Sequence, residues 1–259
     1  MTEAPDFGAT LAWLLEHRGI GVRDVVAAAG LSADGVRAVL KGKTPSEQLV
    51  RELAPAFGFH PVDLLILAGL DVPEDLAPLD ASAEQWVSRI VIEAVHLPAA
   101  RRREVVRLMH SLPQEERIAD FAPKWLPLLS SDPGNRIIRM LRYRNLGWSG
   151  LAKTMAVVTP TYLAASTFGV IEAGRKELTP RLVVDIAALL GIDASELAAF
   201  TGVVLPELPR PPAPEAVDSA ALLWEARRLS AGQAQYVSEL TGSMRGDSGD
   251  GYVINVPGS

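Results

Sequence analysis

The chain of 259 residues contains no cysteine and no long hydrophobic run. Without cysteine, disulfides, thiolate zinc sites, iron–sulfur clusters and a cysteine nucleophile are all excluded. The longest uncharged stretch lies between Lys153 and Glu172, and its Ser and Thr residues make it too polar for a membrane span. The first residues are acidic and lack the basic and then apolar layout of a signal peptide. We therefore expect a cytoplasmic protein with no membrane partner.

A general surplus of basic residues is also missing. The formal net charge is −6, which argues against a surface that attracts nucleic acid everywhere. The charge is uneven, however: residues 1–75 hold 6 basic and 11 acidic side chains, whereas residues 131–205 hold 8 and 6. Any anion-binding face must therefore be local. With 48% hydrophobic residues, the chain can still bury a substantial core.

Motifs for catalysis and metal binding are absent. The four histidines, His17, His60, His96 and His110, follow no metal-ligand spacing. A phosphate-binding loop of the GxxxxGK type is missing. The sequence GDSGD at residues 246–250 matches the nucleophile motif of trypsin-like proteases, but that chemistry needs a β-barrel domain that presents a His and an Asp. We expect no enzyme activity, no metal site and no cofactor.

The two halves of the chain match each other. At an offset of 126, Leu11, Leu14, Leu15, Arg18, Val25 and Val26 fall on Ile137, Met140, Leu141, Arg144, Leu151 and Ala152. Residues 53–69 match 186–202 at an offset of 133, and residues 93–108 match 225–240 at 132. Three matches in the same order predict two copies of one unit of about 125 residues.

Each copy begins with short helical patterns, at 7–70 and 133–203, and continues with a pair of helices, at 81–112 and 216–244. Strand-like alternation is almost absent, so the predicted fold class is all-α. In the first copy the patterns predict five helices, at residues 11–18, 22–29, 33–40, 47–57 and 62–67. Gly30 permits a left-handed turn after the second helix, and Ser32 is suited to cap the third.

The end of this pattern is the most specific part, with KGKTPSEQLVRELAPAFGFHPVDLLILAG at 41–69 and EAGRKELTPRLVVDIAALLGIDASELAAFTG at 172–202. It resembles the Xre-type, lambda-repressor-like helix-turn-helix family, in two tandem copies that cover about 140 residues. The resemblance implies that the third helix enters the DNA major groove and that the second lies across the DNA backbone.

The resemblance also implies the residues that contact DNA. In the first copy these are Ser32, Asp34, Gly35 and Arg37 for base edges, with Lys41 and Lys43 for phosphates. In the second copy they are Thr159, Thr161, Tyr162, Ser166 and Thr167, with Arg175 and Lys176 for phosphates. Lys153, Arg142 and Arg144 are expected to add local positive charge. The second copy carries about six extra residues between Lys153 and Ile171, either inside the recognition helix or just before it.

These patterns divide the chain. We expect helix-turn-helix domains at 1–78 and 130–205, a helical hairpin with a linker at 79–129, and a proline-rich linker with a second hairpin at 206–245. A flexible tail follows at 246–259, in which residues 252–256 alternate as a short strand would.

The leading hypothesis is a sequence-specific, DNA-binding transcriptional regulator that uses the two modules as a pseudo-dimer on double-stranded DNA. The alternative is a protein-interaction scaffold that keeps the fold but has lost DNA binding. Family members often place a Gln early in the second helix, where this chain has Val22 and Trp148. A homodimer and a protein partner both remain open from the sequence.

Overall fold

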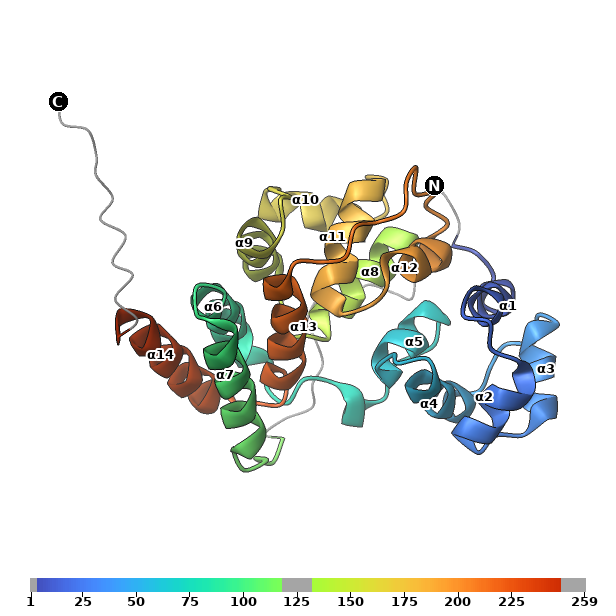
Figure 1. Ribbon diagram of the computed structural model, residues 1–259, viewed down its shortest axis with the longest axis horizontal. Coiled ribbons are helices and arrows are strands. Elements are labelled where there is room, and N and C mark those ends of the chain that lie inside the picture. Colours follow the sequence, from blue (N-terminus) through green and yellow to red (C-terminus); the bar gives the residue numbers. More distant parts are fainter. Residues whose placement is uncertain (1–3, 118–131, 248–259) are drawn as a thin grey trace.

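The computed structural model describes residues 4–117 and 132–247. Within these ranges the chain forms fourteen α-helices, two short 3-10 helices and no strand, which confirms the predicted all-α class. The expected strand at 252–256 lies outside the described residues. Figure 1 shows three groups of helices: α1 to α5 at one end, α8 to α12 in the middle, and α6, α7, α13 and α14 at the other end.

The first unit consists of α1 (Phe7–His17), α2 (Val22–Ala29), α3 (Ala33–Leu40), α4 (Glu47–Ala56) and α5 (Pro61–Leu67). The five predicted helices are therefore confirmed, with shifted ends. Helix α1 starts four residues earlier than its apolar pattern because Asp6 caps it, accepting a hydrogen bond from the Ala9 backbone N–H (3.0 Å). Ser46 caps α4 in the same way, through the Leu49 N–H (3.3 Å).

The second unit consists of α8 (Pro133–Arg142), α9 (Trp148–Val158), α10 (Ala165–Glu172), α11 (Pro180–Leu190) and α12 (Ala194–Thr201). Asp132 caps α8 through the Asn135 N–H (3.1 Å), and Thr179 caps α11 through the Leu182 N–H (3.2 Å). These caps stand where Asp6 and Ser46 stand in the first unit. In both units, the first and fourth helices thus begin with a side-chain N-cap.

A close contact between the first and third helices also occurs in both units. A Cβ on Gly8 of α1 would lie 2.2 Å from the carbonyl oxygen of Val39 in α3. A Cβ on Gly134 of α8 would lie 2.7 Å from the carbonyl oxygen of Ile171 in α10. Only glycine allows the backbones to approach this closely, so each third helix is held against the start of its first helix.

The remaining helices, α6 (Glu84–Ala94), α7 (Ala99–Ser111), α13 (Pro214–Ala226) and α14 (Ala231–Asp247), form a four-helix bundle. Helix α6 packs mainly on α14, and α7 packs mainly on α13, so each pair of helices is locked to the other pair rather than standing alone (Figure 1). The bundle rests on the second unit, with α6 against α9 and α13 against α11. Among the described elements, no bundle helix packs as extensively on a helix of the first unit.

The two five-helix units contact each other reciprocally. Helix α1 packs on α12, and α5 packs on α8. Arg18, after α1, donates to both carboxylate oxygens of Glu196 in α12, at 2.5 and 2.6 Å. Arg144, after α8, donates to both oxygens of Asp63 in α5, with Nη2 at 2.7 Å from Oδ2. Each unit therefore gives one arginine to an acid of the other.

These contacts correct one expectation. Arg142 and Arg144 were predicted to add local positive charge, but both are buried and neutralised. Arg142 donates to Glu172 (Nη2–Oε2 3.1 Å), and Arg144 is fully enclosed with Asp63. A charge in a low-dielectric interior needs a partner, and here the partners lie about 30 and 80 positions away in the sequence. Charge counting along the chain cannot reveal such pairing.

The bundle joins the two units at one junction. The ring of His60, just before α5, stacks on Trp224 of α13, with 3.4 Å between ring centroids and 6° between the planes. Arg227 and Arg144 also lie over the Trp224 ring, at 3.8 and 5.3 Å from its centroid. Burial, and then the positive charges of Arg144 and Arg227, lower the pKa of His60 to about 3. His60 is therefore neutral at physiological pH.

Breaking the buried pair is expected to destabilise the fold. Asp63→Asn leaves the Arg144 guanidinium buried without a counter-charge, which costs about 3–5 kcal/mol. Urea unfolding followed by circular dichroism measures the loss. The matched control is Asp75→Asn, which removes one of the two exposed acidic partners of Arg51 and is expected to cost less than about 1 kcal/mol. Equal losses in the two variants would contradict the buried role of Asp63.

Stability is expected to fall on acidification because of His60. Its folded pKa, about 3, lies below the ordinary value of 6.5, so the unfolded chain takes up a proton first as the pH falls. The resulting loss, up to about 1.4 kcal/mol per pH unit, begins near pH 6.5 and continues towards pH 3. Unfolding free energies at pH 7 and pH 5 are expected to differ less in His60→Gln than in the wild type. The exposed His96→Gln variant should keep the wild-type difference.

Candidate nucleic-acid interface

Helices α2 and α3 form a compact corner at the free end of the first unit. Gly30 ends α2 in the left-handed conformation (φ 68°), which turns the chain within three residues into α3. Val36 and Val39 of α3 are buried in the core, so the opposite side of the helix faces solvent. The exposed side carries Asp34 and Arg37.

Ser32 stands at the N-cap position of α3, as predicted, but its hydroxyl forms no capping hydrogen bond. The side chain is exposed instead. Asp34 is 93% exposed, and Arg37 is 52% exposed with Nη1 at 3.3 Å from the Asp34 carboxylate. An exposed pair of this kind is weak, so Arg37 can exchange Asp34 for another partner at little cost.

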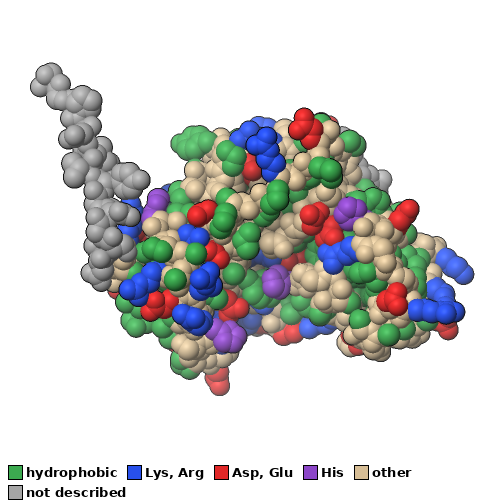
Figure 2. All heavy atoms as spheres, in the orientation of Figure 1, with side chains coloured by type: hydrophobic (Ala, Val, Ile, Leu, Met, Phe, Trp, Pro, Cys, Tyr) green, Lys and Arg blue, Asp and Glu red, His purple; other side chains and the backbone are tan. Residues whose placement is uncertain are grey.

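The loop after α3 projects two lysines. Gly42 adopts a left-handed conformation (φ 87°), and the backbone N–H of Lys43 returns to the carbonyl of Ala38 (3.1 Å). This tight ending exposes both Lys41 and Lys43. With Arg37 they form a cationic set on one end of α3, and Figure 2 shows Lys and Arg side chains gathered at this end of the molecule.

Sequence reasoning missed Arg23. It is the second residue of α2, is exposed, and makes no ion pair with any described residue. Its neighbour Asp24 is occupied by the backbone, since Asp24 Oδ2 accepts from the Gly21 N–H (3.0 Å). The sequence did contain a signal for this residue: Arg23 lies in the first turn of the second helix, next to Val22, which stands where family members often have a DNA-contacting glutamine. Arg23 adds one exposed cation on α2 to the three on α3 and the loop that follows it.

The structure locates the extra residues of the second unit. Helices α3 and α10 each have 8 residues, whereas α9 has 11 against 8 in α2, and its turn to α10 spans 159–164 against 30–32. Half of the insertion thus lengthens α9 and half lengthens the turn. The insertion falls before the third helix of this unit, which resolves the alternative that the sequence left open.

The predicted second-copy residues are therefore spread over two elements. Thr159, Thr161 and Tyr162 lie in the turn before α10, and Ser166 and Thr167 lie in its first turn. The Thr159 hydroxyl donates to the Met155 carbonyl (2.8 Å), and the Thr161 hydroxyl donates to Asp185. Both hydroxyls thus serve the unit's own structure, while Tyr162 is 86% exposed.

Helix α10 presents no cation. Its fifth residue is Gly169, where α3 has Arg37, and a Cβ there would lie 2.8 Å from the Trp148 ring. The Trp148 indole lies over this glycine and donates to Glu172 (2.7 Å), which Arg142 also contacts. A network of Trp148, Arg142 and Glu172 therefore occupies the side of α10 that would hold an Arg37 counterpart.

The exposed cations of the second unit lie around α10 rather than on it. Lys153 projects from α9, and Arg175 and Lys176 project from the loop after α10. The carboxylate of Glu84, from α6, lies against Gly147 at the start of α9, so negative charge already occupies that helix end. In Figure 1 α3 and the α10–α11 loop stand apart, so the cations of the two units form two separate groups.

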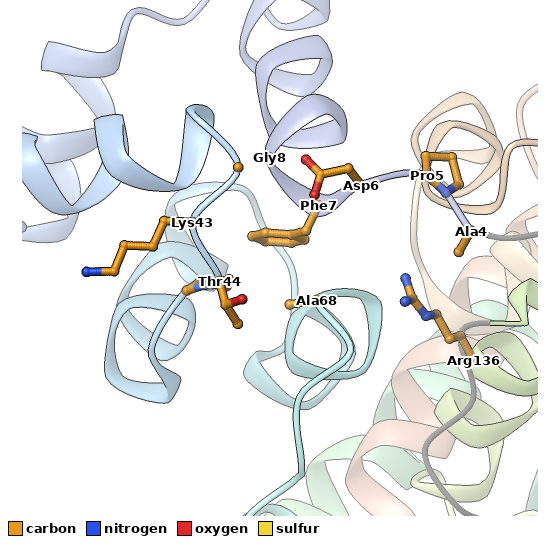
Figure 3. Close-up of a pocket in the computed structure, with 11 residues that line it drawn as sticks. Ala4, Pro5, Asp6, Phe7, Gly8, Lys43, Thr44, Ala68 and Arg136 are labelled. Carbon is orange, nitrogen blue, oxygen red and sulfur yellow. The ribbon is translucent and has the colours of Figure 1, made fainter.

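A pocket of about 570 Å³ lies beside the α3–α4 loop (Figure 3). Asp6 and Phe7 of the first unit and Arg136 of the second unit line it. Arg136 donates to the Leu67 carbonyl (2.8 Å) and so links the two units, whereas Asp6 caps α1 within the first unit, so both charged groups already have a partner in the fold. The Lys43 side chain points away from both of them (Figure 3), which leaves it directed towards solvent.

Among the described residues, no group of three or more His, Asp or Glu side chains could hold a metal ion. No helix in the described ranges is both long enough and apolar enough to cross a membrane.

Comparison with known proteins identifies one part of the chain. A family model described as a helix-turn-helix domain matches residues 6–65, from the cap of α1 into α5. The cationic set on α2 and α3 lies inside this match. Searches of curated proteins and of solved structures found no match.

Proposed function

We propose that this protein is a sequence-specific DNA-binding transcriptional regulator whose first unit makes the principal contact with double-stranded DNA. The observation that carries the proposal is the cationic set of Arg23, Arg37, Lys41 and Lys43, which is exposed on α2 and α3. It lies within the helix-turn-helix match, although the protein as a whole has a net charge of −6. A local cationic set on an acidic protein fits a defined DNA contact better than general attraction.

Each side chain has a role in this proposal. Arg37 would donate two hydrogen bonds to a guanine, which discriminates against other bases by roughly 1–3 kcal/mol. Ser32 and Asp34 would meet neighbouring base edges, and Gly35 would allow the helix to approach the groove closely. Lys41, Lys43 and Arg23 would neutralise phosphates, which positions α3 without reading the sequence.

We also propose that the chain is two tandem copies of one unit and forms a pseudo-dimer. Arg18 and Arg144 match at the offset of 126, and Asp63 and Glu196 match at the offset of 133. Each arginine pairs with the acid of the other unit, as happens when identical subunits meet across a two-fold axis. The two helical hairpins pack in the same reciprocal way. The first helix of each hairpin, α6 or α13, packs on the second helix of the other, α14 or α7.

The second unit has a different part in this arrangement. Its third helix has Gly169 in place of Arg37 and Ala173 in place of Lys41, so we assign it phosphate contacts only, through Lys153, Arg175 and Lys176. Two half-sites about 34 Å apart, one helical turn of DNA, would then be read unequally. The expected operator is therefore asymmetric rather than a perfect palindrome.

The alternative function is a protein-interaction scaffold. The exposed apolar residues of the second unit, Trp148, Val157 and Tyr162, favour it. The two functions differ in one respect that can be measured, because a scaffold without a DNA face shows no salt-dependent binding to DNA.

Removal of the two lysines is expected to change the salt dependence of DNA binding. Fluorescence anisotropy with fragments of DNA from the source genome gives the affinity at several salt concentrations. The slope of log K against log salt should become shallower by about 2 in the Lys41→Ala, Lys43→Ala double variant, because two phosphate contacts are lost. Arg103→Ala with Arg107→Ala removes two exposed charges from α7 and should keep the wild-type slope. No binding by the wild type at low salt would support the scaffold.

Arg37→Ala is expected to act on specificity. Affinity for the preferred fragment should fall by about 1–3 kcal/mol, while affinity for unrelated DNA changes little, because only the base contact is lost. Competition between specific and unrelated duplexes separates the two effects. The matched control is Arg175→Ala, which removes a phosphate contact and should weaken both duplexes alike. An equal loss on both duplexes in Arg37→Ala would remove it from base reading.

A further inference from the structure

The second unit exposes an apolar surface where the first unit exposes cations. Val157, near the end of α9, and Tyr162, in the following turn, are 39% and 86% exposed and line the same groove. Hydrophobic side chains stand at the surface in this part of the molecule (Figure 2). Exposed aromatic and aliphatic residues that gather in one place mark a binding surface more often than single exposed residues do.

Part of this surface is a groove of about 440 Å³. Ile92 of α6 forms one side, Ala156 and Val157 of α9 form another, and residues 162–165 close it. Lys153 is the only charged residue that lines it. The groove therefore suits an apolar segment with a negative charge near one end.

The groove is a product of the insertion and of the bundle. The three extra residues of α9 and the three extra residues of the turn build its wall, and α6 supplies the other side. In the described part of the first unit the corresponding turn spans only 30–32, and no bundle helix packs extensively on α2, so these two walls of the groove are missing there. The fold alone does not require Tyr162 to be apolar, since its side chain is almost fully exposed.

The last described helix brings the chain to this groove. Helices α6 and α14 lie side by side and run in the same direction: the Ala231 N–H, at the start of α14, donates to Asp80 just before α6 (2.8 Å). At the other end, Arg245 of α14 lies 3.4 Å from Glu93 of α6. Glu93 is the residue after Ile92, which lines the groove. The chain therefore leaves α14 at the same end of α6 as the groove.

We propose that the chain's own residues 252–256, YVINV, bind in this groove. Four of these five residues are apolar, and Asp247 and Asp250 precede them, which complements Lys153. Five Cα steps separate residue 247 from residue 252 and span up to about 17 Å. Packed helix axes lie about 8–10 Å apart, so a segment that starts beside α6 can pass to its other side. The glycines at 249 and 251 allow the chain to turn on the way.

Engineered disulfides test the proposal directly, because the chain has no cysteine of its own. The test variant carries Val157→Cys and Ile254→Cys in the full chain. The matched control carries Ala27→Cys, at an exposed site on α2, with the same Ile254→Cys. A segment bound in the groove holds its cysteine at a high effective concentration, so the test pair should form an intramolecular disulfide at least about tenfold faster than the control.

The possible results distinguish binding of the chain's own segment from binding of the same segment of a second copy. A disulfide-linked dimer, formed at a rate that rises with protein concentration, would mean that the segment of a second copy binds, and would overturn the intramolecular proposal. Equal rates in test and control would overturn it as well. As a second measurement, hydrogen exchange of residues 152–165 should be faster in the full chain with Ile254→Asp and Val256→Asp than in the wild type. Unchanged exchange would contradict the proposal. None of these measurements involves DNA, so they are independent of the proposed function.

Discussion

The buried pair between Arg144 and Asp63 is the contact on which the arrangement of the molecule depends. Both side chains are almost completely excluded from solvent and each is the other's counter-charge, so loss of either one alone would leave an uncompensated charge between the two five-helix units. The pair between Arg18 and Glu196 repeats the exchange on the other side of the interface. His60 and Trp224 stack beside Arg144 and bring the bundle to the same place. The units and the bundle are thus joined by one cluster of charged and aromatic groups.

The bundle makes the two units unequal. It packs on α9 and α11 and leaves α2 and α4 of the first unit uncovered. The covered unit has Trp148 and Gly169 where the uncovered unit has Val22 and Arg37, and an acidic residue of α6, Glu84, lies at the start of α9. In the proposed pseudo-dimer, this difference assigns DNA reading to the first unit. The second unit also carries the apolar groove between α9 and α6.

Much of the local structure could be predicted from the sequence, because helices depend on short-range patterns. The five helices of the first unit and the all-α class followed from apolar spacing, and Gly30 marked the turn into α3. The family resemblance implied that Arg37, Lys41 and Lys43 face outward, and all three are exposed. The position of the insertion could not be predicted, since extra residues inside the third helix and extra residues just before it fit the same alignment. The search for a glutamine near Val22 passed over the exposed Arg23.

The sequence by itself determined the all-α class and the five helices of the first unit, because helix formation depends on residues within a few turns of one another. Only the tertiary structure decided which charges are available. Arg144 and Arg37 are both arginines near the end of a helix, yet one is enclosed by Asp63 and the other faces solvent. That difference comes from a carboxylate 81 positions away, and long-range pairing of this kind leaves no local pattern in the sequence.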